Sequence, residues 1–518
     1  MLNLPIKILK TVQIETQTIT ITIDDIDLLV ADWDARAKVT SRHLVIITNC
    51  RDIDVSNSVT QFLRFNGSIA NDYSYQRLSG VDAADSAGRT EGANAINLPP
   101  IPGASNENVW GGSEVLIPDA FSAAKYKSVL ALGGPSEFAI EAVAGDWEQV
   151  AAITSVTIVM GVADEMVVGS TVSIGVVDER DLVEEWISAG VGTPVFDNIP
   201  QGEGDLVMVA SARSSQAAIE DELLHYINDD NTAFPTIELL GIGAGRTSGA
   251  ANGEIAIIPG QTATANVFGA LVINYSQYVK DNQPHFFSLS GYHEMSGPTA
   301  QVRLMSGRRA NIEPINKIEL APTLGVNLLA ASLVSLYRVP KRIIKRVIVP
   351  VGGQAIITLA NIPQNFEALI LHVYARTNEA AVDDEIAITI DADAVAANYD
   401  WQEITGAGGV VAALRNLASQ QLMYVPGDTE GAYEFGGGTA LFPGYAKTDR
   451  HKHILVFDGQ QENRIAISSH RHESLDAITT IVLAPVTGAL FLEGTVVELE
   501  GILKREGLPP DEGMQIGV

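Results

Sequence analysis

The chain has 518 residues, of which 46% are hydrophobic and 19% are charged, and this composition excludes a disordered chain. Its 63 acidic and 33 basic residues give a net charge of −30, which repels phosphate backbones and anionic lipid and argues against nucleic acid or a membrane as partner. No apolar stretch reaches the roughly 18 residues of a membrane span, and the N-terminal segment lacks a signal-peptide pattern. We therefore expect a soluble protein made in the cytoplasm.

Short runs rich in Val, Ile, Thr and aromatic residues recur along the chain, with Gly, Pro, Asn and Asp between them, and predict strands joined by turns. In chain order the expected strands are 18–23, 44–48, 58–65, 127–132, 153–160, 170–177, 206–210, 222–227, 268–275, 286–290, 317–321, 332–337, 356–359, 368–374, 385–390, 453–457, 464–468, 480–484 and 495–499. Roughly seven or eight strands in about 150 residues favour an antiparallel jelly-roll sandwich. An immunoglobulin-type sandwich, which needs only about 100 residues, is the alternative.

Helices are expected at only two places. Residues 181–190 predict a short helix that ends at a glycine, and residues 410–424 predict another. Residues 79–112 and 406–438 have the composition of long loops, which in an assembly protein are candidate contact elements. Gly241 to Gly245 is glycine-rich, but no lysine or helix follows it, so we expect a mobile loop and not a phosphate-binding loop.

One module is repeated three times. Arg51, Arg213 and Arg376 each follow an apolar run and stand 162 and 163 residues apart. An isoleucine lies 102 residues after each arginine, a serine or threonine lies 119 residues after it, and Asn or Asp at a predicted turn lies 15 residues after it; in chain order these are Ile153, Ile315 and Ile478, then Ser170, Ser332 and Thr495, then Asn66, Asn228 and Asp391. Such a period sets the architecture.

The repeat predicts three tandem all-β jelly-roll domains with few short helices. The expected boundaries are 1–181 for the first module with an N-terminal strand arm, 182–340 for the second, 341–503 for the third, and 504–518 for a C-terminal tail. Asn198-Ile-Pro-Gln201 and Asn361-Ile-Pro-Gln364 precede the second and third copies at matching distance and mark where each module begins.

The repeated arginines have two interpretations. Each could bind an anionic ligand, or each could pair with an acid of its own module and fix a loop at the edge of the sheet, which we favour. Asp54, Glu220 and Asp383 are the nearest candidate partners, and Tyr73, Phe234 and Tyr399 are expected to be core or sheet-edge aromatics. The basic segment 341–346 is expected to be a solvated linker rather than an anion site.

Motifs for phosphate binding, dinucleotide binding, zinc proteases and serine hydrolases do not occur in the sequence. Asp391 and Asp393 resemble part of a calcium loop, but Asn66 stands at the like place in the first copy, which favours a tight turn. The single cysteine, Cys50, lies beside an apolar run, which favours a small buried side chain over a reactive thiol.

Histidine is the strongest chemical candidate. His451 and His453 form one closely spaced pair, and His470 and His472 form another, so two neighbouring strands could gather four imidazoles around a metal. Only the third module has these pairs, so we expect exposed strand-edge or loop histidines instead of a metal site. Ser468, Ser469, His470 and Asp476 are hydrolase residue types without the surrounding motif. We therefore predict no catalytic, cofactor-binding or metal-binding residues.

The segment from Arg51 through Arg64-Phe-Asn-Gly67 to Asn71 and Tyr73 resembles a signature of jelly-roll modules in structural proteins of tailed-bacteriophage particles. The second and third copies keep the arginine, the turn and an aromatic but depart from Arg-Phe-Asn-Gly. The resemblance implies a non-enzymatic virion protein, such as a capsid decoration, head-associated or tail protein that docks on neighbouring capsid or tail subunits through loops and strand arms.

A receptor- or glycan-binding fibre or adhesin is the alternative, but the five tryptophans are scattered along the sequence, which favours assembly. We also expect a homo-oligomer, a trimer before a dimer, whose interfaces use apolar loop and strand surface because the net charge disfavours close self-approach.

Overall fold

The computed structural model describes residues 4–37, 40–105, 107–135, 138–161, 164–202, 204–230, 234–279, 284–293, 300–309, 311–339, 341–431, 434–460 and 463–503. Most of the regular secondary structure in this part of the chain is β-strand, arranged in six antiparallel sheets. Three have eight strands and three have four, and each third of the chain contributes one sheet of each size. We call these sheet pairs units 1, 2 and 3.

Unit 1 consists of β1 (Ile6–Gln13), β2 (Thr20–Ile23), α1 (Ile26–Ala37), β3 (Leu44–Asn49), β4 (Ser58–Phe65), β5 (Tyr73–Val81), β6 (Ala84–Ala93), β7 (Ile96–Pro102), β8 (Gly111–Ile117), β9 (Lys127–Pro135), β10 (Ala139–Trp147), β11 (Val156–Met160) and β12 (Thr171–Val177). A 3-10 turn, η1 (Glu179–Asp181), leads into unit 2.

Unit 2 consists of β13 (Leu182–Ile187), β14 (Val195–Phe196), β15 (Asp205–Ala212), β16 (Glu220–Ile227), β17 (Pro235–Ile242), β18 (Gly245–Asn252), β19 (Glu254–Pro259), β20 (Gly269–Ser276), β21 (His285–His293), β22 (Ala300–Arg308), β23 (Ile318–Pro322) and β24 (Leu333–Val339).

Unit 3 consists of β25 (Ile343–Ile348), β26 (Ile357–Ala360), β27 (Phe366–Ala375), β28 (Asp383–Ile390), η2 (Ala396–Asn398), β29 (Tyr399–Ala407), β30 (Val410–Asn416), β31 (Gln421–Pro426), β32 (Gly436–Pro443), β33 (Lys452–Gln460), β34 (Arg464–His472), β35 (Thr480–Pro485) and β36 (Val496–Leu503).

The strand order is the same in all three units. In unit 1 the eight-stranded sheet runs β1-β12-β3-β8-β9-β10-β5-β6 and the four-stranded sheet runs β2-β11-β4-β7, and the strands of units 2 and 3 follow in equivalent positions. The two sheets of a unit pack face to face around an apolar core, as in a β-sandwich. In the four-stranded sheets, β16 and β28 alternate buried and half-buried residues, because one face of the strand meets the core and the other lies nearer the solvent.

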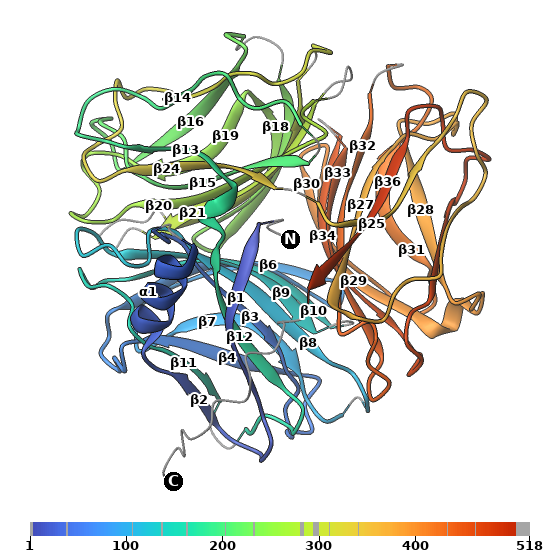
Figure 1. Ribbon diagram of the computed structural model, residues 1–518, viewed down its shortest axis with the longest axis horizontal. Helices are drawn as coiled ribbons and strands as arrows, with labels where there is room; N and C mark the ends of the chain where they lie inside the picture. Colours follow the sequence, from blue (N-terminus) through green and yellow to red (C-terminus); the bar gives the residue numbers. More distant parts are fainter. Residues whose placement is uncertain are drawn as a thin grey trace.

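A fourth apolar core joins the three units. It contains side chains from the second face of every eight-stranded sheet. Examples are Leu130, Ala142 and Ala144 in unit 1, Val272 in unit 2, and Ile467 in unit 3. Both faces of these sheets are therefore buried, which explains why strands such as β9, β21 and β33 are buried along their whole length. Figure 1 shows the three units arranged around this centre.

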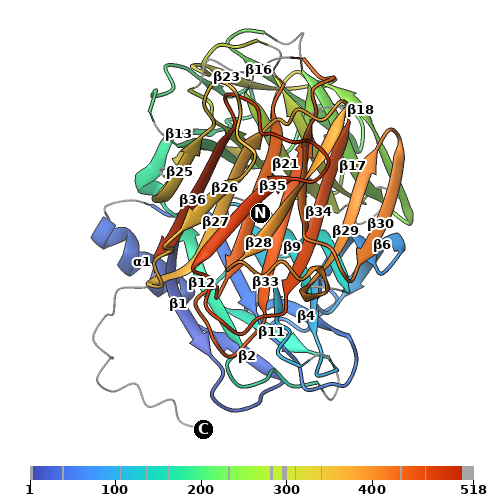
Figure 2. The same cartoon turned by 90° about the vertical axis from the view of Figure 1, so that its right-hand side faces the viewer.

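The two ends of the central axis carry different strands of the eight-stranded sheets. Strands β6, β18 and β30 contact one another at one end of the central axis, whereas β1, β13 and β25 lie toward the other end, and the side view separates the two sets (Figure 2). The hairpins β5–β6, β17–β18 and β29–β30 each have a glycine where the units meet. A Cβ on Gly80 would lie 3.1 Å from Glu403 O, and a Cβ on Gly406 would lie 2.5 Å from Ser248 Oγ. This close approach requires small residues.

Several expectations from the sequence were wrong. Residues 181–190 form the strand β13 instead of a helix, and residues 410–424 lie mostly in β30 and β31. The expected loop 79–112 contains β6, β7 and the start of β8, and the expected loop 406–438 contains β30, β31 and the start of β32. Gly241 to Gly245 is the tight turn of the β17–β18 hairpin.

Two further differences concern the ends of the units. The helix α1 was not predicted; its buried residues Ile26, Val30 and Trp33 lie on one face at helical spacing. The basic segment 341–346 is not a solvated linker, because Lys341 is buried and residues from Ile343 onward form β25.

Candidate assembly interface

The repeated arginine lies at the same place in every unit, directly after β3, β15 or β27. Its backbone N–H donates to the hydroxyl of the residue that follows 119 positions later, at 3.2 Å from Arg51 to Ser170, 3.1 Å from Arg213 to Ser332 and 3.3 Å from Arg376 to Thr495. The two landmarks of the repeat are thus bonding partners, and this explains why both recur with a fixed spacing.

The guanidinium groups fix a loop, as the sequence indicated, but their main partners are carbonyl groups. Arg213 donates to the carbonyl oxygens of Gly260, Gln261, Ala263 and Thr264. Arg376 donates to Gly427 O, Asp428 O and Glu430 O, and Arg51 to Ala104 O. Arg376 also pairs with Asp428 at 3.1 Å.

The acids expected to pair with these arginines have other roles. Glu220 accepts from Tyr292 and Gln301, Asp383 lies 3.6 Å from Arg464, and Asp54 accepts from the backbone of Ser56. The arginines therefore hold the β7–β8, β19–β20 and β31–β32 loops, and we call these the anchored loops.

The turn residues were predicted correctly. Asn66, Asn228 and Asp391 have φ of 50°, 52° and 49°, the left-handed conformation that Asn and Asp tolerate. Each side-chain oxygen accepts hydrogen bonds from two backbone N–H groups at or just before the start of the neighbouring strand in the four-stranded sheet (β11, β23 or β35). In unit 1, Thr154 and Ser155 donate to Asn66.

The aromatics Tyr73, Phe234 and Tyr399 are buried in their cores. The hydroxyl groups of Tyr73 and Tyr399 each accept from the last residue of the preceding strand, at 2.8 and 2.9 Å. Ile153, Ile315 and Ile478 are also fully buried.

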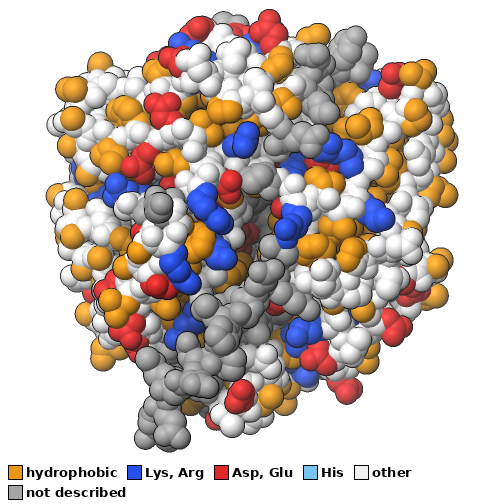
Figure 3. Space-filling view, viewed as in Figure 1, with side chains coloured by type: hydrophobic (Ala, Val, Ile, Leu, Met, Phe, Trp, Pro, Cys, Tyr) orange, Lys and Arg blue, Asp and Glu red, His pale blue; other side chains and the backbone are white. Residues whose placement is uncertain are grey.

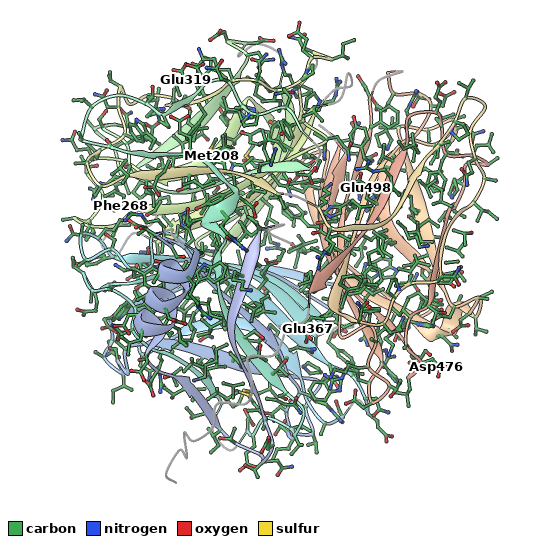
Figure 4. The ribbon with its side chains drawn as sticks, viewed as in Figure 1. Met208, Phe268, Glu319, Glu367, Asp476 and Glu498 are labelled. Atoms are coloured by element: carbon green, nitrogen blue, oxygen red, sulfur yellow. The ribbon has the colours of Figure 1, made fainter. Side chains whose placement is uncertain are left out.

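Each anchored loop meets another unit, and the three contacts close a ring. We call the boundary of units 1 and 2 the first seam, that of units 2 and 3 the second, and that of units 3 and 1 the third. Figure 4 shows Phe268, which ends one anchored loop, where unit 2 meets unit 1, and Glu498 where unit 3 meets unit 2.

At the first seam a buried lysine crosses from unit 1 to unit 2. Lys125 Nζ lies 2.8 Å from Asp119, donates to Ala331 O at 2.8 Å, and lies 4.9 Å from the centre of the Phe268 ring. Burial lowers the pKa of Lys125. Nearby, the backbone N–H of Tyr126 donates to Asn266 O at 3.0 Å.

His43 is the second buried polar group of the first seam. Its Nδ1 accepts from the backbone N–H of Asp119 at 3.2 Å, and its Nε2 lies 3.2 Å from Ser335 Oγ in unit 2. Since Nδ1 accepts, the proton of the neutral ring is on Nε2. Burial lowers the pKa of His43 to about 3. Glu179 accepts from Tyr337 Oη at 2.9 Å, and burial raises its pKa to about 7.

The second seam is built on ion pairs. Lys341 Nζ lies 2.9 Å from Asp205 in unit 2 and 3.0 Å from Glu498 in unit 3, and all three side chains are at least 96% buried. Burial alone would raise the pKa of Glu498, but Lys341 outweighs it and lowers that pKa. Arg308 of unit 2 also pairs with Glu434 of the third anchored loop at 2.5 Å.

The third seam repeats the chemistry of the first with other residues. The Arg450 guanidinium of unit 3 lies 3.8 Å from the centre of the Trp110 ring, at the end of the first anchored loop. The backbone N–H of His451 donates to Asn108 O at 2.9 Å, and Gln402 donates to Asp82 O at 2.8 Å.

The four paired histidines of unit 3 do not converge on one point, and the expectation of exposed histidines was wrong, because His453, His470 and His472 are buried in β33 and β34. His453 lies 2.9 Å from Ser469 Oγ, His470 lies 2.7 Å from Ser468 Oγ, and His472 lies 3.0 Å from Asp393. Burial lowers the pKa of His453 and His470 to about 3. Within the described ranges, no group of three or more His, Cys, Asp or Glu side chains is placed to hold a metal ion.

Cys50 is fully buried, and burial raises the pKa of its thiol to about 12. This agrees with the expected role as a small core side chain. In the part of the chain that the structure describes, no helix is long and apolar enough to cross a membrane.

Comparison with known proteins assigns the chain to no family. No family model matches the chain, and no curated protein matches it. Among solved structures, a DUF3598-family protein of unknown function from Nostoc punctiforme is 7% identical with a TM-score of 0.09, covering 52% of this chain and 95% of its own. Pseudomonas aeruginosa OccK5 is 7% identical with a TM-score of 0.10, covering 83% of this chain and 98% of its own. A mutant of the monoaromatic hydrocarbon channel TodX is 10% identical with a TM-score of 0.09, covering 87% and 92%.

Proposed function

We propose that this chain is a non-enzymatic structural component of a tailed-phage virion, a capsid decoration, head-associated or tail protein built from three jelly-roll sandwiches. The observation that carries the proposal is the closed ring: three like sandwiches bury one face of every large sheet against one another and seal their seams with buried charged groups. Such a ring presents similar surfaces about one axis, which suits a block that docks on a symmetric assembly.

The residues that resemble phage jelly-roll modules support the proposal through their structural roles. Arg51 holds an anchored loop, Asn66 organises the turn after β4, and Tyr73 bonds the backbone of Phe65. In this proposal none of these residues acts on a substrate, and the protein is made in the host cytoplasm and ends in the virion.

Immunogold electron microscopy tests the proposal. Antibodies raised against the purified chain should label intact particles produced by the source of this sequence, at the head or at the tail. Particle preparations that contain no copy of the chain by mass spectrometry, while the chain is abundant in the infected cell, would overturn it.

The receptor- or glycan-binding alternative has no observation in its favour. Trp33, Trp110, Trp147 and Trp401 are all buried, whereas sugar-binding sites usually expose aromatic faces. The expected homo-oligomer remains a prediction. Because one chain already forms a threefold ring, association of further copies requires the outer surfaces, and sedimentation of the purified chain would measure it.

A further inference from the structure

Lysine and arginine side chains gather around the centre of the face that carries β1, β13 and β25 (Figure 3). The basic residues of these strands and of the segments beside them, apart from the buried Lys341, are Lys7, Lys10, Arg180, Arg338, Arg342, Lys345 and Arg346. We call this set the basic face. It stands out because the whole chain carries a net charge of −30.

Acidic residues are also present on this face. Glu184 of β13 is exposed, but beside Arg180 and at β25 the acidic partners lie deeper than the basic residues. The Arg180 side chain is 56% exposed, whereas its partner Asp178 is 9% exposed. Arg346 is 30% exposed above Glu498, which is 2% exposed. Arg342 is exposed and Lys345 half-buried. At β25 an approaching partner therefore meets the cations first, and the local field favours a negatively charged partner.

The same strands end their sheets. β1, β13 and β25 stand at the margin of the three eight-stranded sheets, and in the described part of the chain each pairs with one neighbour alone, β12, β24 or β36. An edge strand presents backbone donors and acceptors to an added strand. β25 combines this edge with the largest number of basic side chains, since Lys345 and Arg346 lie within it and Arg342 directly before it.

We propose that the basic face binds an extended acidic polypeptide, which adds as a further strand to β25 and pairs its carboxylates with Arg342, Lys345 and Arg346. Strand addition supplies affinity through backbone hydrogen bonds, and the charges supply register. A nucleic acid fits less well, because a long polyphosphate would extend from the basic face over the surrounding acidic surface. This inference does not depend on the proposed function.

The test uses the purified full-length chain and a fluorescent peptide of Glu-Glu-Thr repeats. This peptide carries carboxylates on both faces of an added strand, which is needed because Lys345 and Arg346 are adjacent in β25. Fluorescence anisotropy at low ionic strength should show saturable binding that weakens with added salt. The double variant Arg342→Glu with Lys345→Glu should lower the affinity at least about tenfold, the size expected for reversing two rim charges. Arg64→Glu, on β4 of a four-stranded sheet, is the matched control and should leave binding unchanged.

Two further probes separate the alternatives. A peptide of equal charge with proline in place of threonine lacks the backbone N–H at every proline, which interrupts the strand ladder, and it should bind more weakly if a strand is added. A single-stranded oligonucleotide of equal charge should bind less tightly than the acidic peptide. The proposal is overturned if the acidic peptide does not bind, if the proline peptide binds equally well, or if the oligonucleotide binds better. A double variant that melts at the wild-type temperature shows that its effect is not caused by misfolding.

Discussion

The first and second seams join the same kinds of sheet at equivalent positions, yet they are held by different chemistry. The first buries a neutral imidazole and a single lysine that lies against an aromatic ring, through His43, Lys125 and Phe268. The second buries one lysine between two carboxylates, Asp205 and Glu498. The shared topology thus fixes where the units meet, and local residues decide how each seam responds to mutation and pH.

The largest effect is expected from Lys341→Met. Methionine would leave Asp205 and Glu498 buried without their cation, and breaking a buried ion pair in this way costs about 3–5 kcal/mol. Chemical denaturation should show this loss in the free energy of unfolding. The triple variant that adds Asp205→Asn and Glu498→Gln should recover much of it; a triple variant no more stable than Lys341→Met would show that the charges are not the cause.

The next largest effect is expected from removing the arginines that hold the anchored loops, and its size should differ between the second and first loops. Arg213→Met removes a guanidinium that donates to four carbonyl oxygens, whereas Arg51→Met removes one such bond to Ala104. Hydrogen bonds to charged groups contribute about 1.5–3 kcal/mol each, without adding fully. We expect Arg213→Met to lower the free energy of unfolding by about 3–4 kcal/mol and Arg51→Met by about 1–2 kcal/mol. Equal losses would contradict the assigned difference between the two loops.

The seams also differ in their response to acid. The folded-state pKa of His43 is about 3, below its usual 6.5, so the unfolded chain binds the extra proton and stability is lost as pH falls below about 6.5. The pKa of Glu498 is lowered, so its contribution is present above its usual value of about 4.5 and is lost only below it. Mild acid therefore weakens the first seam through His43, whereas the contribution of Glu498 at the second seam is lost only at lower pH.

His43→Gln tests this response. Glutamine can accept from Asp119 and donate to Ser335 but does not titrate. Between about pH 7.5 and about pH 5, the stability of the variant relative to the wild type should increase by about 2 kcal/mol. The wild type itself should change less, because Glu179, whose pKa is raised to about 7, gains stability over the same range. A stability difference between variant and wild type that does not depend on pH would contradict the buried neutral ring.

The sequence predicted the repeat and most strands because those depend on local patterns. The fixed spacing of Arg51 and Ser170 reflects a hydrogen bond between the two residues, and Asn66 and Asp391 lie in turns, as expected. The helix predicted at 181–190 failed because Leu182, Val183 and Trp186 imitate helical spacing, while pairing with β24 makes the segment a strand.

The seams could not be predicted in this way. Each is made by a few residues from loops and strands far apart in the sequence, such as Lys125 with Ala331 and Lys341 with Asp205 and Glu498. A single charged residue in a loop usually indicates a solvated surface, so nothing in the local pattern distinguished these residues. The one signal of a shared centre was the absence of alternation between apolar and polar residues in strands such as β9 and β33, which are buried on both faces.

The smallest expected effect is the difference in coupling free energy between the cation–ring contacts of the first and third seams. A double-mutant cycle with Lys125→Met and Phe268→Leu should give a coupling free energy of about 0.5–1 kcal/mol. The cycle with Arg450→Met and Trp110→Leu should give about 1–2 kcal/mol, because tryptophan is the better partner and its ring centre lies 3.8 Å from the guanidinium, compared with 4.9 Å for the ammonium over Phe268. A larger coupling at the first seam would mean that Lys125 is held mainly through its ring contact, and that its bonds to Asp119 and Ala331 contribute less than their lengths suggest.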